Sequence, residues 1–246
     1  MERAEYYKMY EHEDHYWWYR GLHELVLSYV EESSLGKPLR ILDAGCGTGR
    51  LMQLLQPFGQ VEGFDASKDA ILLCTKRGLQ NIRINNLNTW EPPHSTFDVI
   101  ISNDVVCRST VDDDWQVIKK YQTALKSKGI LIINYPAFEL LRRAHDTAVF
   151  GKRRYRKRDI KQQYHALGFR IRSATYRLPL LFILIFLKKF LFESWVAKDK
   201  LTSDLKPINP FVNRVLLAMH RVDNWLVRRK IPLFLGSSLF VVCQKP

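Results

Sequence analysis

The sequence predicts an α/β fold in which a mainly parallel sheet is covered by helices on both faces. The first observation is that short apolar runs alternate with helix-like segments from about residue 38 to residue 177, as strands alternate with helices in such folds. The second is a glycine-rich turn directly after the first of these runs. The third is a hydrophobic fraction of 46% in 246 residues, which is enough for a sizeable core.

The strands are expected where apolar runs end at turn residues. In chain order they are PLRILDAG, QVEGFDAS, QNIRIN, FDVIIS, GILIINYP and RIRSATYR, with SSLFVVCQK as a last strand near the C-terminus. Helices are expected at residues 14–32, RLMQLLQ, SKDAILLCTKRG, residues 112–128 and RDIKQQYHALGF. The segment SKDAILLCTKRG begins at a serine and ends at a glycine, which are favoured helix-capping residues.

The alternation stops after the sixth strand. Residues 178–187 contain no polar side chain, and two lysines then interrupt the run. A polar loop with two prolines follows, and residues 211–230 are expected to form an amphipathic helix. Its apolar stripe consists of Val212, Val215, Met219, Val222 and Leu226. The chain is therefore expected to contain an N-terminal helical cap (1–35), a core (36–177), a helical insertion (178–236) and the final strand of the core sheet (237–246).

The net charge of +13 is concentrated in one part of the chain. Residues 142–189 contain 14 Lys and Arg against Asp146 and Asp159, a balance of +12. Such a block, which includes GKRRYRKR, indicates a polyanionic partner such as lipid head groups or nucleic acid. The four cysteines are scattered without metal-ligand or disulfide spacing, which is typical of a protein in a reducing cytosol. The charged, aromatic N-terminus does not resemble a signal peptide.

The segment ILDAGCGTGR is the most informative motif. It follows a strand and opens a helix, and its glycines Gly45, Gly47 and Gly49 let a ligand approach the backbone closely. Asp43 stands two residues before the first glycine, and Asp65 ends the next strand. A carboxylate at that second place can accept hydrogen bonds from both ribose hydroxyls of a nucleoside. The loop therefore predicts a nucleoside-containing ligand.

With these residues the chain resembles the class I S-adenosylmethionine-dependent methyltransferases, over residues 39–176 and 238–244. The resemblance implies a Rossmann-like seven-stranded sheet with an antiparallel last strand, interrupted here by a two-helix insertion between strands six and seven. It implies S-adenosyl-L-methionine as the cofactor. It also implies that the binding residues are Asp43, Ala44, Gly45, Cys46, Gly47 and Gly49 of the loop, Asp65, Ala66 and Ser67 after the second strand, Asn86 and Leu87 after the third, and Asn103 in SNDVVCRST after the fourth.

More of the chain resembles one bacterial branch of that family, which is associated with cell-envelope saccharide and lipid pathways. The segments that carry this resemblance are HYWWYRG, YPAFELLRRAHD with GKRRY, and PLFLGSSLFVV. In this interpretation Tyr16 and Arg20 close over the cofactor as part of a lid. The alternative is that the aromatic residues pack on the edge of the sheet.

Methyl transfer to a hydroxyl oxygen needs a base. His145, with Asp146 beside it, is expected to serve because it follows the fifth strand at the carboxyl edge of the sheet, where ligands of α/β proteins bind. The alternative is a loop histidine that only orients backbone or substrate. No residue pattern indicates a metal.

Three functions remain open at this point. The first is a methyltransferase that acts, by O-methylation, on a membrane-associated or lipid-linked acceptor. The second is an RNA or soluble small-molecule methyltransferase. Nucleic acid is the less expected acceptor, because no Asn/Asp-Pro-Pro-aromatic tetrad follows the fourth strand, which argues against methylation of base amino groups and leaves ribose and other RNA targets open. The third is a non-catalytic scaffold that binds the cofactor.

The expected location of the protein follows from the insertion at residues 178–236. Ten apolar residues are too few for a membrane span, which needs about 20. We expect two helices that project from the domain and hold a cytoplasmic protein peripherally on the anionic inner face of the membrane. A homodimer that buries the same apolar face is the alternative.

Overall fold

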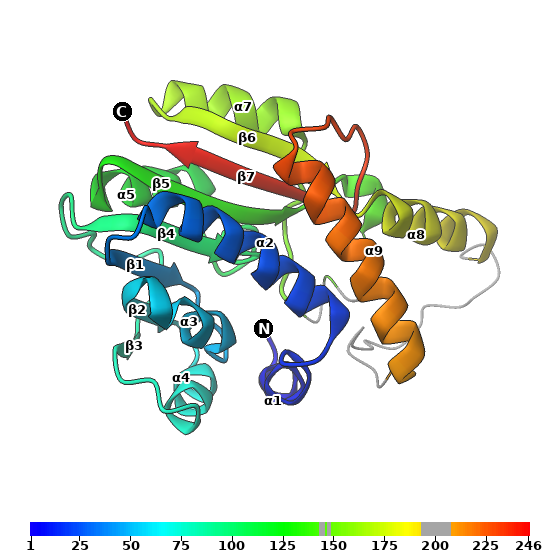
Figure 1. Cartoon of the computed structure of the whole chain (residues 1–246), viewed down its shortest axis with the longest axis horizontal. Helices are drawn as coiled ribbons and strands as arrows, with labels where there is room; N and C mark the ends of the chain where they lie inside the picture. The colour runs from blue at the N-terminus through cyan, green and yellow to red at the C-terminus, as the bar shows by residue number, and fades with distance from the viewer. Residues whose placement is uncertain (143–145, 147–148, 193–207) are drawn as a thin grey trace.

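The structure is a computed structural model, and it describes residues 1–142, 146, 149–192 and 208–246 (Figure 1). Its helices and strands follow one another as α1 (Arg3–His12), α2 (Trp17–Ser34), β1 (Leu39–Ala44), α3 (Arg50–Leu55), η1 (Gln56–Phe58), β2 (Gly59–Asp65), α4 (Lys68–Lys76), β3 (Ile82–Ile84), β4 (Phe97–Asn103), α5 (Asp114–Ala124), β5 (Leu125–Pro136), η2 (Glu139–Leu141), α7 (Lys157–Ala166), β6 (Arg170–Arg177), α8 (Pro179–Phe192), α9 (Pro210–Arg228) and β7 (Ser238–Gln244).

One seven-stranded sheet runs through the molecule in the order β3-β2-β1-β4-β5-β7-β6. The pairs β1–β2, β1–β4, β2–β3 and β4–β5 are parallel, and β7 is antiparallel to both β5 and β6. Helices α2 and α9 lie side by side over one face of the sheet, and α5 and α7 lie over the other (Figure 1). This confirms the predicted fold class, including the antiparallel last strand and the helices between β6 and β7.

The core is divided by the sheet into two apolar clusters. One joins α5 and α7 to their face through Val117, Ile118 and Ile160. The other joins α2 to the opposite face through Leu22, Leu25 and Val26, as the helical period of that segment predicts. The central parallel strands β1 and β4 are almost fully buried, since helices cover them on both sides.

Two helix boundaries differ from the predicted ones. The expected helix 112–128 ends at Ala124, because Leu125 turns to an extended backbone (φ −70°, ψ 140°) and pairs with Phe97 on β4. Its start is as expected: the Asp113 side chain accepts hydrogen bonds from the backbone N–H groups of Trp115 and Gln116. The predicted helix 14–32 corresponds to α2 (Trp17–Ser34), and α1 (Arg3–His12), which was not predicted, precedes it with a turn at residues 13–16 between them.

Helix α9 turns its apolar stripe away from the protein, which is the outward direction that the sequence analysis expects. Its apolar stripe faces solvent: Val222 is 60% exposed, Trp225 is 54% exposed, and Phe211, Val212, Val215 and Met219 are exposed as well. The side that packs on the protein carries the polar residues His220, Asp223 and Asn224, which are all buried. The expectation that both insertion helices project from the domain is therefore wrong for α9, which packs along α2.

The cause of this orientation is Arg177, the last residue of β6, whose side chain is 1% exposed. A buried guanidinium needs hydrogen-bond partners, because its desolvation is costly. Its Nη2 donates to Oδ1 of Asn224 at 3.2 Å and to Nε2 of His220, and its Nε lies 3.7 Å from Oδ2 of Asp223. Three polar residues of α9 thus meet one buried charge, and they fix which side of the helix faces inward.

His220 can accept this hydrogen bond because it is neutral. Burial and the charge of Arg177 lower the pKa of His220 to about 3. Burial lowers the pKa of Arg177 to about 10, so the arginine stays charged at neutral pH. The other ring nitrogen of His220 lies 3.3 Å from the carbonyl oxygen of Trp17 on α2 and donates to it.

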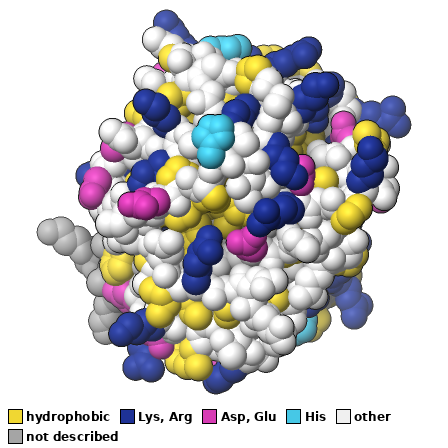
Figure 2. Space-filling view, turned by 90° about the vertical axis from the view of Figure 1, so that its left-hand side faces the viewer, with side chains coloured by type: hydrophobic (Ala, Val, Ile, Leu, Met, Phe, Trp, Pro, Cys, Tyr) yellow, Lys and Arg dark blue, Asp and Glu magenta, His cyan; other side chains and the backbone are white. Residues whose placement is uncertain are grey.

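In the part of the chain that the structure describes, no helix combines the length and the apolar character that a membrane crossing requires. The edge at the amino ends of the parallel strands, which faces the viewer in Figure 2, shows basic and acidic side chains interspersed.

Replacing Gly21 by alanine tests the contact between α2 and α9. An added Cβ would lie 2.0 Å from Nδ1 of His220, so Gly21→Ala is expected to destabilise the protein by about 1–3 kcal/mol, although alanine is the better helix former. Chemical denaturation measures the change. In a His220→Ala background the same substitution should cost much less, and an equal cost in both backgrounds would contradict the contact.

Candidate active site

A pocket of about 290 Å³ opens at the carboxyl ends of β1, β2 and β4. This is the edge at which ligands of parallel α/β sheets bind. The predicted cofactor residues that line it are Gly45, Gly47, Asp65, Ala66, Ser67, Asn86, Leu87 and Asn103. The lining residues that the sequence did not single out are Met1, Tyr6, Met9, Phe64, Asn85, Val105, Arg108, Thr110 and Val111.

The glycine loop forms one wall of the pocket in a conformation that favours glycine. Gly45 and Gly47 have φ of +87° and +54°, in the left-handed region that costs other residues free energy. A Cβ on Gly45 would lie 2.4 Å from the Val105 side chain, and one on Gly47 would lie 2.7 Å from Cε of Met9. The absence of side chains at these two residues leaves the cradle open.

Asp65 is the polar centre of the pocket. Its Oδ2 accepts a hydrogen bond from the Gly47 N–H at 3.1 Å. Its Oδ1 accepts from the Ser67 N–H at 2.9 Å and from the Tyr6 hydroxyl at 3.1 Å. A carboxylate offers about four acceptor sites, so a ribose hydroxyl can share Oδ2, whereas at Oδ1 it competes with Tyr6.

Helix α1, rather than the start of α2, covers the pocket. It contributes Tyr6 and Met9 to the lining, and Glu13 after it ties the cover to the glycine loop. The Glu13 carboxylate accepts a hydrogen bond from the Thr48 hydroxyl and pairs with Arg77 at 2.8 Å. Burial raises the pKa of Glu13 to about 7, so this connection weakens when the carboxyl takes up a proton.

The two residues predicted to form the lid stand elsewhere. Tyr16 is the N-cap of α2, and its ring lies 6.2 Å from the ring of Trp17. Arg20 is exposed and lies 4.0 Å from Glu24 on the next turn of the same helix. Neither lines the pocket in this structure, because the preceding turn directs α2 away from the loop toward α9.

The remaining loop residues support the cradle from behind. Asp43, Ala44 and Cys46 are buried, and Gly49 is the N-cap of α3. Burial and the neighbouring charge of Asp65 raise the pKa of Asp43 to about 7. The Cys46 sulfur lies 4.0 Å from the sulfur of Cys74 on α4.

Asn103, at the end of β4, presents an unsatisfied acceptor to the pocket. Its Oδ1 is buried and has no hydrogen-bond partner among the described residues, although buried amide oxygens are normally hydrogen-bonded. A ligand with an N–H or ammonium group would satisfy it. This is the property expected of a side chain that contacts a cofactor.

Of the predicted catalytic pair His145 and Asp146, only Asp146 lies within the described residues, and His145 lies outside them. Asp146 is buried, and both of its carboxylate oxygens accept hydrogen bonds from Nη2 of Arg154, at 2.8 and 2.9 Å. Asp146 therefore has the surroundings of a structural ion pair. A catalytic role for His145 stays a prediction.

Asp104 is a stronger candidate for a base, although the sequence analysis did not single it out. It stands between the two pocket residues Asn103 and Val105, and its φ of +54° places it in the left-handed region. Its Oδ2 accepts a hydrogen bond from Nδ2 of Asn134 on β5 at 2.9 Å. Burial raises the pKa of Asp104 to about 6, against the opposing effects of Asn134 and of the charge on Arg108. Strained, titratable residues of this kind cluster at functional sites.

The sequence matches the family model of a methyltransferase domain over residues 35–174. The chain belongs to this family. Among curated proteins it is 32% identical over 115 residues to the ribosomal RNA small subunit methyltransferase C of Alcanivorax borkumensis, covering 44% of this chain and 35% of that protein. It is also 32% identical over 107 residues to the trans-aconitate 2-methyltransferase of Variovorax paradoxus, covering 42% of this chain and 40% of that protein. The chain spans less than half the length of these curated relatives.

Solved structures agree on the fold. An S-adenosylmethionine-dependent methyltransferase from Mesorhizobium loti superposes with a TM-score of 0.56 at 15% identity, covering 85% of this chain and 91% of that one. A phosphoethanolamine N-methyltransferase 2 from Haemonchus contortus, in complex with S-adenosyl-L-methionine, gives a TM-score of 0.53 at 18% identity, covering 85% of this chain and 49% of that one. The resemblance to a cell-envelope branch stays a prediction, since none of the relatives named here is associated with it.

Methyltransferase domains of this fold use S-adenosyl-L-methionine as the methyl donor, and the pocket fits it. Asp65 would accept hydrogen bonds from the ribose hydroxyls. Leu87 and Val111 supply apolar walls for a purine. Asn103 would satisfy its unpaired Oδ1 with the amino group of the methionine part, while the bare backbone at Gly45 and Gly47 leaves the space that part needs.

Replacing Asp65 by alanine should weaken cofactor binding about ten- to hundredfold, because hydrogen bonds to a charged group contribute about 1.5–3 kcal/mol each. Gly47→Val should weaken binding by filling the cradle. Isothermal titration calorimetry with S-adenosyl-L-methionine measures both. Asp159→Ala is the matched control, since this exposed carboxylate on α7 does not line the pocket. Unchanged affinity in a folded Asp65→Ala protein would place the cofactor elsewhere.

Proposed function

We propose that the protein is an S-adenosyl-L-methionine-dependent methyltransferase that methylates an oxygen atom of a small-molecule acceptor, with Asp104 as the general base. The observation that carries this proposal is the half-buried carboxylate of Asp104, which directly follows the pocket residue Asn103 in the chain and has its pKa raised to about 6. When bound, the cofactor supplies a methyl group on a positively charged sulfur, which is ready for transfer.

The residues of this chain have two tasks in such a reaction. The first is to hold the acceptor oxygen in line with the methyl group, because positioning contributes much of the rate enhancement. The second is to receive the acceptor's proton: the O–H bond breaks toward Asp104, and the oxygen lone pair is freed for the new C–O bond. A carboxylate with a pKa near 6 is ionised at neutral pH and is still basic enough to assist.

Asn134 and Arg108 position this carboxylate. The Asn134 amide donates to Oδ2 of Asp104, and the Asp104 N–H donates to the Asn134 carbonyl at 2.9 Å. The Arg108 guanidinium donates to the Asp104 backbone carbonyl at 3.0 Å. The backbone and one carboxylate oxygen are thereby fixed, so an acceptor proton can go to the other oxygen.

The names of the relatives favour a small molecule or ribosomal RNA as acceptor. One is named for trans-aconitate and another for ribosomal RNA, and the match covers 42–44% of this chain. A small-molecule acceptor suits an active site that is covered by α1, since a folded RNA would need that helix to move away.

A lipid-borne acceptor is the second candidate, and the exposed stripe of α9 favours it. Helix α8 exposes Leu180, Ile183, Leu184 and Leu187 in addition. The guanidinium of Arg229 lies 5.6 Å from the ring of exposed Trp225, a pair that suits the interface between head groups and acyl chains. In the basic block, however, Arg153 and Arg154 pair with Asp114 and Asp146, so fewer of its charges face a membrane than the sequence suggests.

Replacing Asp104 by asparagine should reduce turnover by about 10²–10⁴-fold while leaving cofactor affinity nearly unchanged. Asparagine keeps the shape and tolerates the left-handed backbone. In the parent protein the rate should rise with pH up to about 6 and then level off, because only the deprotonated carboxylate accepts a proton. The acceptor comes from a screen in which cofactor with a labelled methyl group is incubated with small-molecule, lipid and RNA fractions of a cell extract.

His145→Ala is the comparison variant in the same assay. If it abolishes turnover while Asp104→Asn does not, the base is His145 and the assignment of Asp104 is wrong. Label that enters RNA alone would overturn the small-molecule acceptor, and label in the lipid fraction would favour the second candidate.

The membrane candidate is tested by flotation with liposomes. The intact protein should float with vesicles rich in anionic lipid, less so at high salt, and Val222→Asp should reduce flotation because it puts a charge in the exposed stripe. Leu35→Asp is the matched control, since Leu35 is 85% exposed at the end of α2, outside the stripe. A protein that stays in solution with such vesicles and runs as a dimer would show that the stripe is an oligomer contact.

A further inference from the structure

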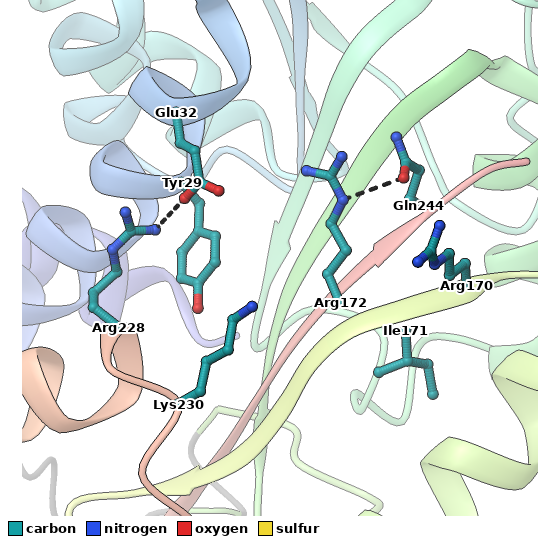
Figure 3. A pocket seen from close by; sticks show the side chains of 8 residues that line it. All are labelled: Tyr29, Glu32, Arg170, Ile171, Arg172, Arg228, Lys230 and Gln244. Carbon is teal, nitrogen blue, oxygen red and sulfur yellow. Dashed lines mark hydrogen bonds and ion pairs between the residues drawn. The ribbon is translucent and has the colours of Figure 1, made fainter.

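A second hollow lies on the opposite side of the α2–α9 pair from the cofactor pocket. Its volume is about 470 Å³, and it separates α2 and the end of α9 from the edge strand β6 and the end of β7 (Figure 3). Residues from these four elements and from the loop after α9 line it: Tyr29, Glu32, Arg170, Ile171, Arg172, Arg228, Lys230 and Gln244.

The hollow carries an excess of positive charge. Four of its lining residues are basic and one is acidic. The carboxylate of Glu32 already forms an ion pair with Arg228, at 2.7 Å. Arg172 donates a hydrogen bond only to the neutral amide oxygen of Gln244, at 3.3 Å. The side chains of Arg170 and Lys230 have no hydrogen bond or ion pair with any other residue that the structure describes. Cations therefore stand on both sides of the hollow without enough carboxylates to balance them (Figure 3).

Lys230 reaches this place through an unfavourable backbone conformation. It follows the C-cap of α9 with φ +58°, in a Schellman turn: the Lys230 N–H donates to the Val227 carbonyl and the Ile231 N–H donates to the Leu226 carbonyl, each at 3.0 Å. Glycine is the usual residue there, because it adopts this conformation without strain. A lysine costs stability at that position, and such a cost is characteristic of a residue with a function.

Charges on an edge strand also keep other strands from pairing with it. That explanation accounts for Arg170 and Arg172 on β6. It does not account for Lys230, which comes from the loop after α9 and faces Arg172 across the hollow (Figure 3).

We propose that this hollow binds a phosphate-bearing anion of about the size of a diphosphate, held by Lys230 and Arg172 from opposite sides with Arg170 in reach. Guanidinium groups match phosphate oxygens in pairs, and lysine adds a compact charge. The site is separate from the methyl-transfer site. Gln244 pairs with Ile130 on β5, whereas the active-site residue Asn134 lies four residues further along that strand, or about 13 Å at the rise of a β-strand.

The test is calorimetric titration of the full-length protein with pyrophosphate at low ionic strength, where exposed charges are least screened. Saturable binding is expected in the parent. Lys230→Gly and Arg172→Gln should each weaken it roughly fivefold, the effect of one basic residue near an anionic surface. Lys230→Gly should also raise the melting temperature, because glycine relieves the strained backbone.

Lys128→Gly is the matched control. Lys128 is an exposed lysine that also has a positive φ, 62°, and its side chain does not line the hollow. It should therefore relieve strain and remove one charge without weakening pyrophosphate binding. If Lys128→Gly weakens binding as much as Lys230→Gly does, the affinity comes from net charge alone and the site is wrong.

Competition distinguishes the sources of the phosphate. If phosphatidylglycerol vesicles displace pyrophosphate from the parent, and Lys230→Gly weakens vesicle binding, the ligand is a lipid head group. If the vesicles have no effect, it is a free phosphate compound. Either result supports the site. It is overturned if the parent shows no saturable pyrophosphate binding, if both variants bind like the parent, or if only RNA binds and pyrophosphate does not displace it.

Discussion

The arrangement of the whole acceptor side depends on one buried charge, the guanidinium of Arg177 at the end of β6. It is too deeply buried to be solvated, so it must be surrounded by protein acceptors. His220, Asp223 and Asn224 of α9 supply them on one side. On the other side its Nη1 lies 3.4 Å from Oδ1 of Asn134, the residue whose amide holds Asp104. The same arginine therefore docks the insertion and supports the residue that positions the proposed base.

This constraint explains why α9 exposes its apolar stripe, although the amphipathic helices of globular proteins usually bury that face. A stripe of Val212, Val215, Met219 and Val222 is recognised correctly as one helical face. Arg177 determines which way that face points. It precedes Val212 by 35 positions in the sequence, and it contacts α9 because the fold brings the two together. Helix position and length could thus be predicted from the sequence, whereas the docking of α9 on α2 through polar residues could not.

The cofactor side shows the opposite situation. The glycine loop, Asp65 and Asn103 all follow predicted strands, and a parallel sheet brings the carboxyl ends of its strands to one edge. Their meeting in one pocket was therefore predictable from strand order. Tyr6 and Met9 were missed because α1 shows no marked apolar period, and Asp104 was missed because its burial and its bond to Asn134 depend on β5. The acid directly after Asn103 in SNDVV was the available signal.

The cofactor pocket and the region around α9 are also formed by different segments of the chain. Apart from the α1 residues that cover it, the cofactor pocket is built from residues 45–111, within the segment that matches the methyltransferase family. The cap and the insertion lie largely outside that segment, yet they are joined: the Asn213 side chain bonds the backbone of both His15 and Trp17, and Asn224 bonds the carbonyl of Gly21. Similarity in the shared segment identifies the methyl donor and does not identify the acceptor.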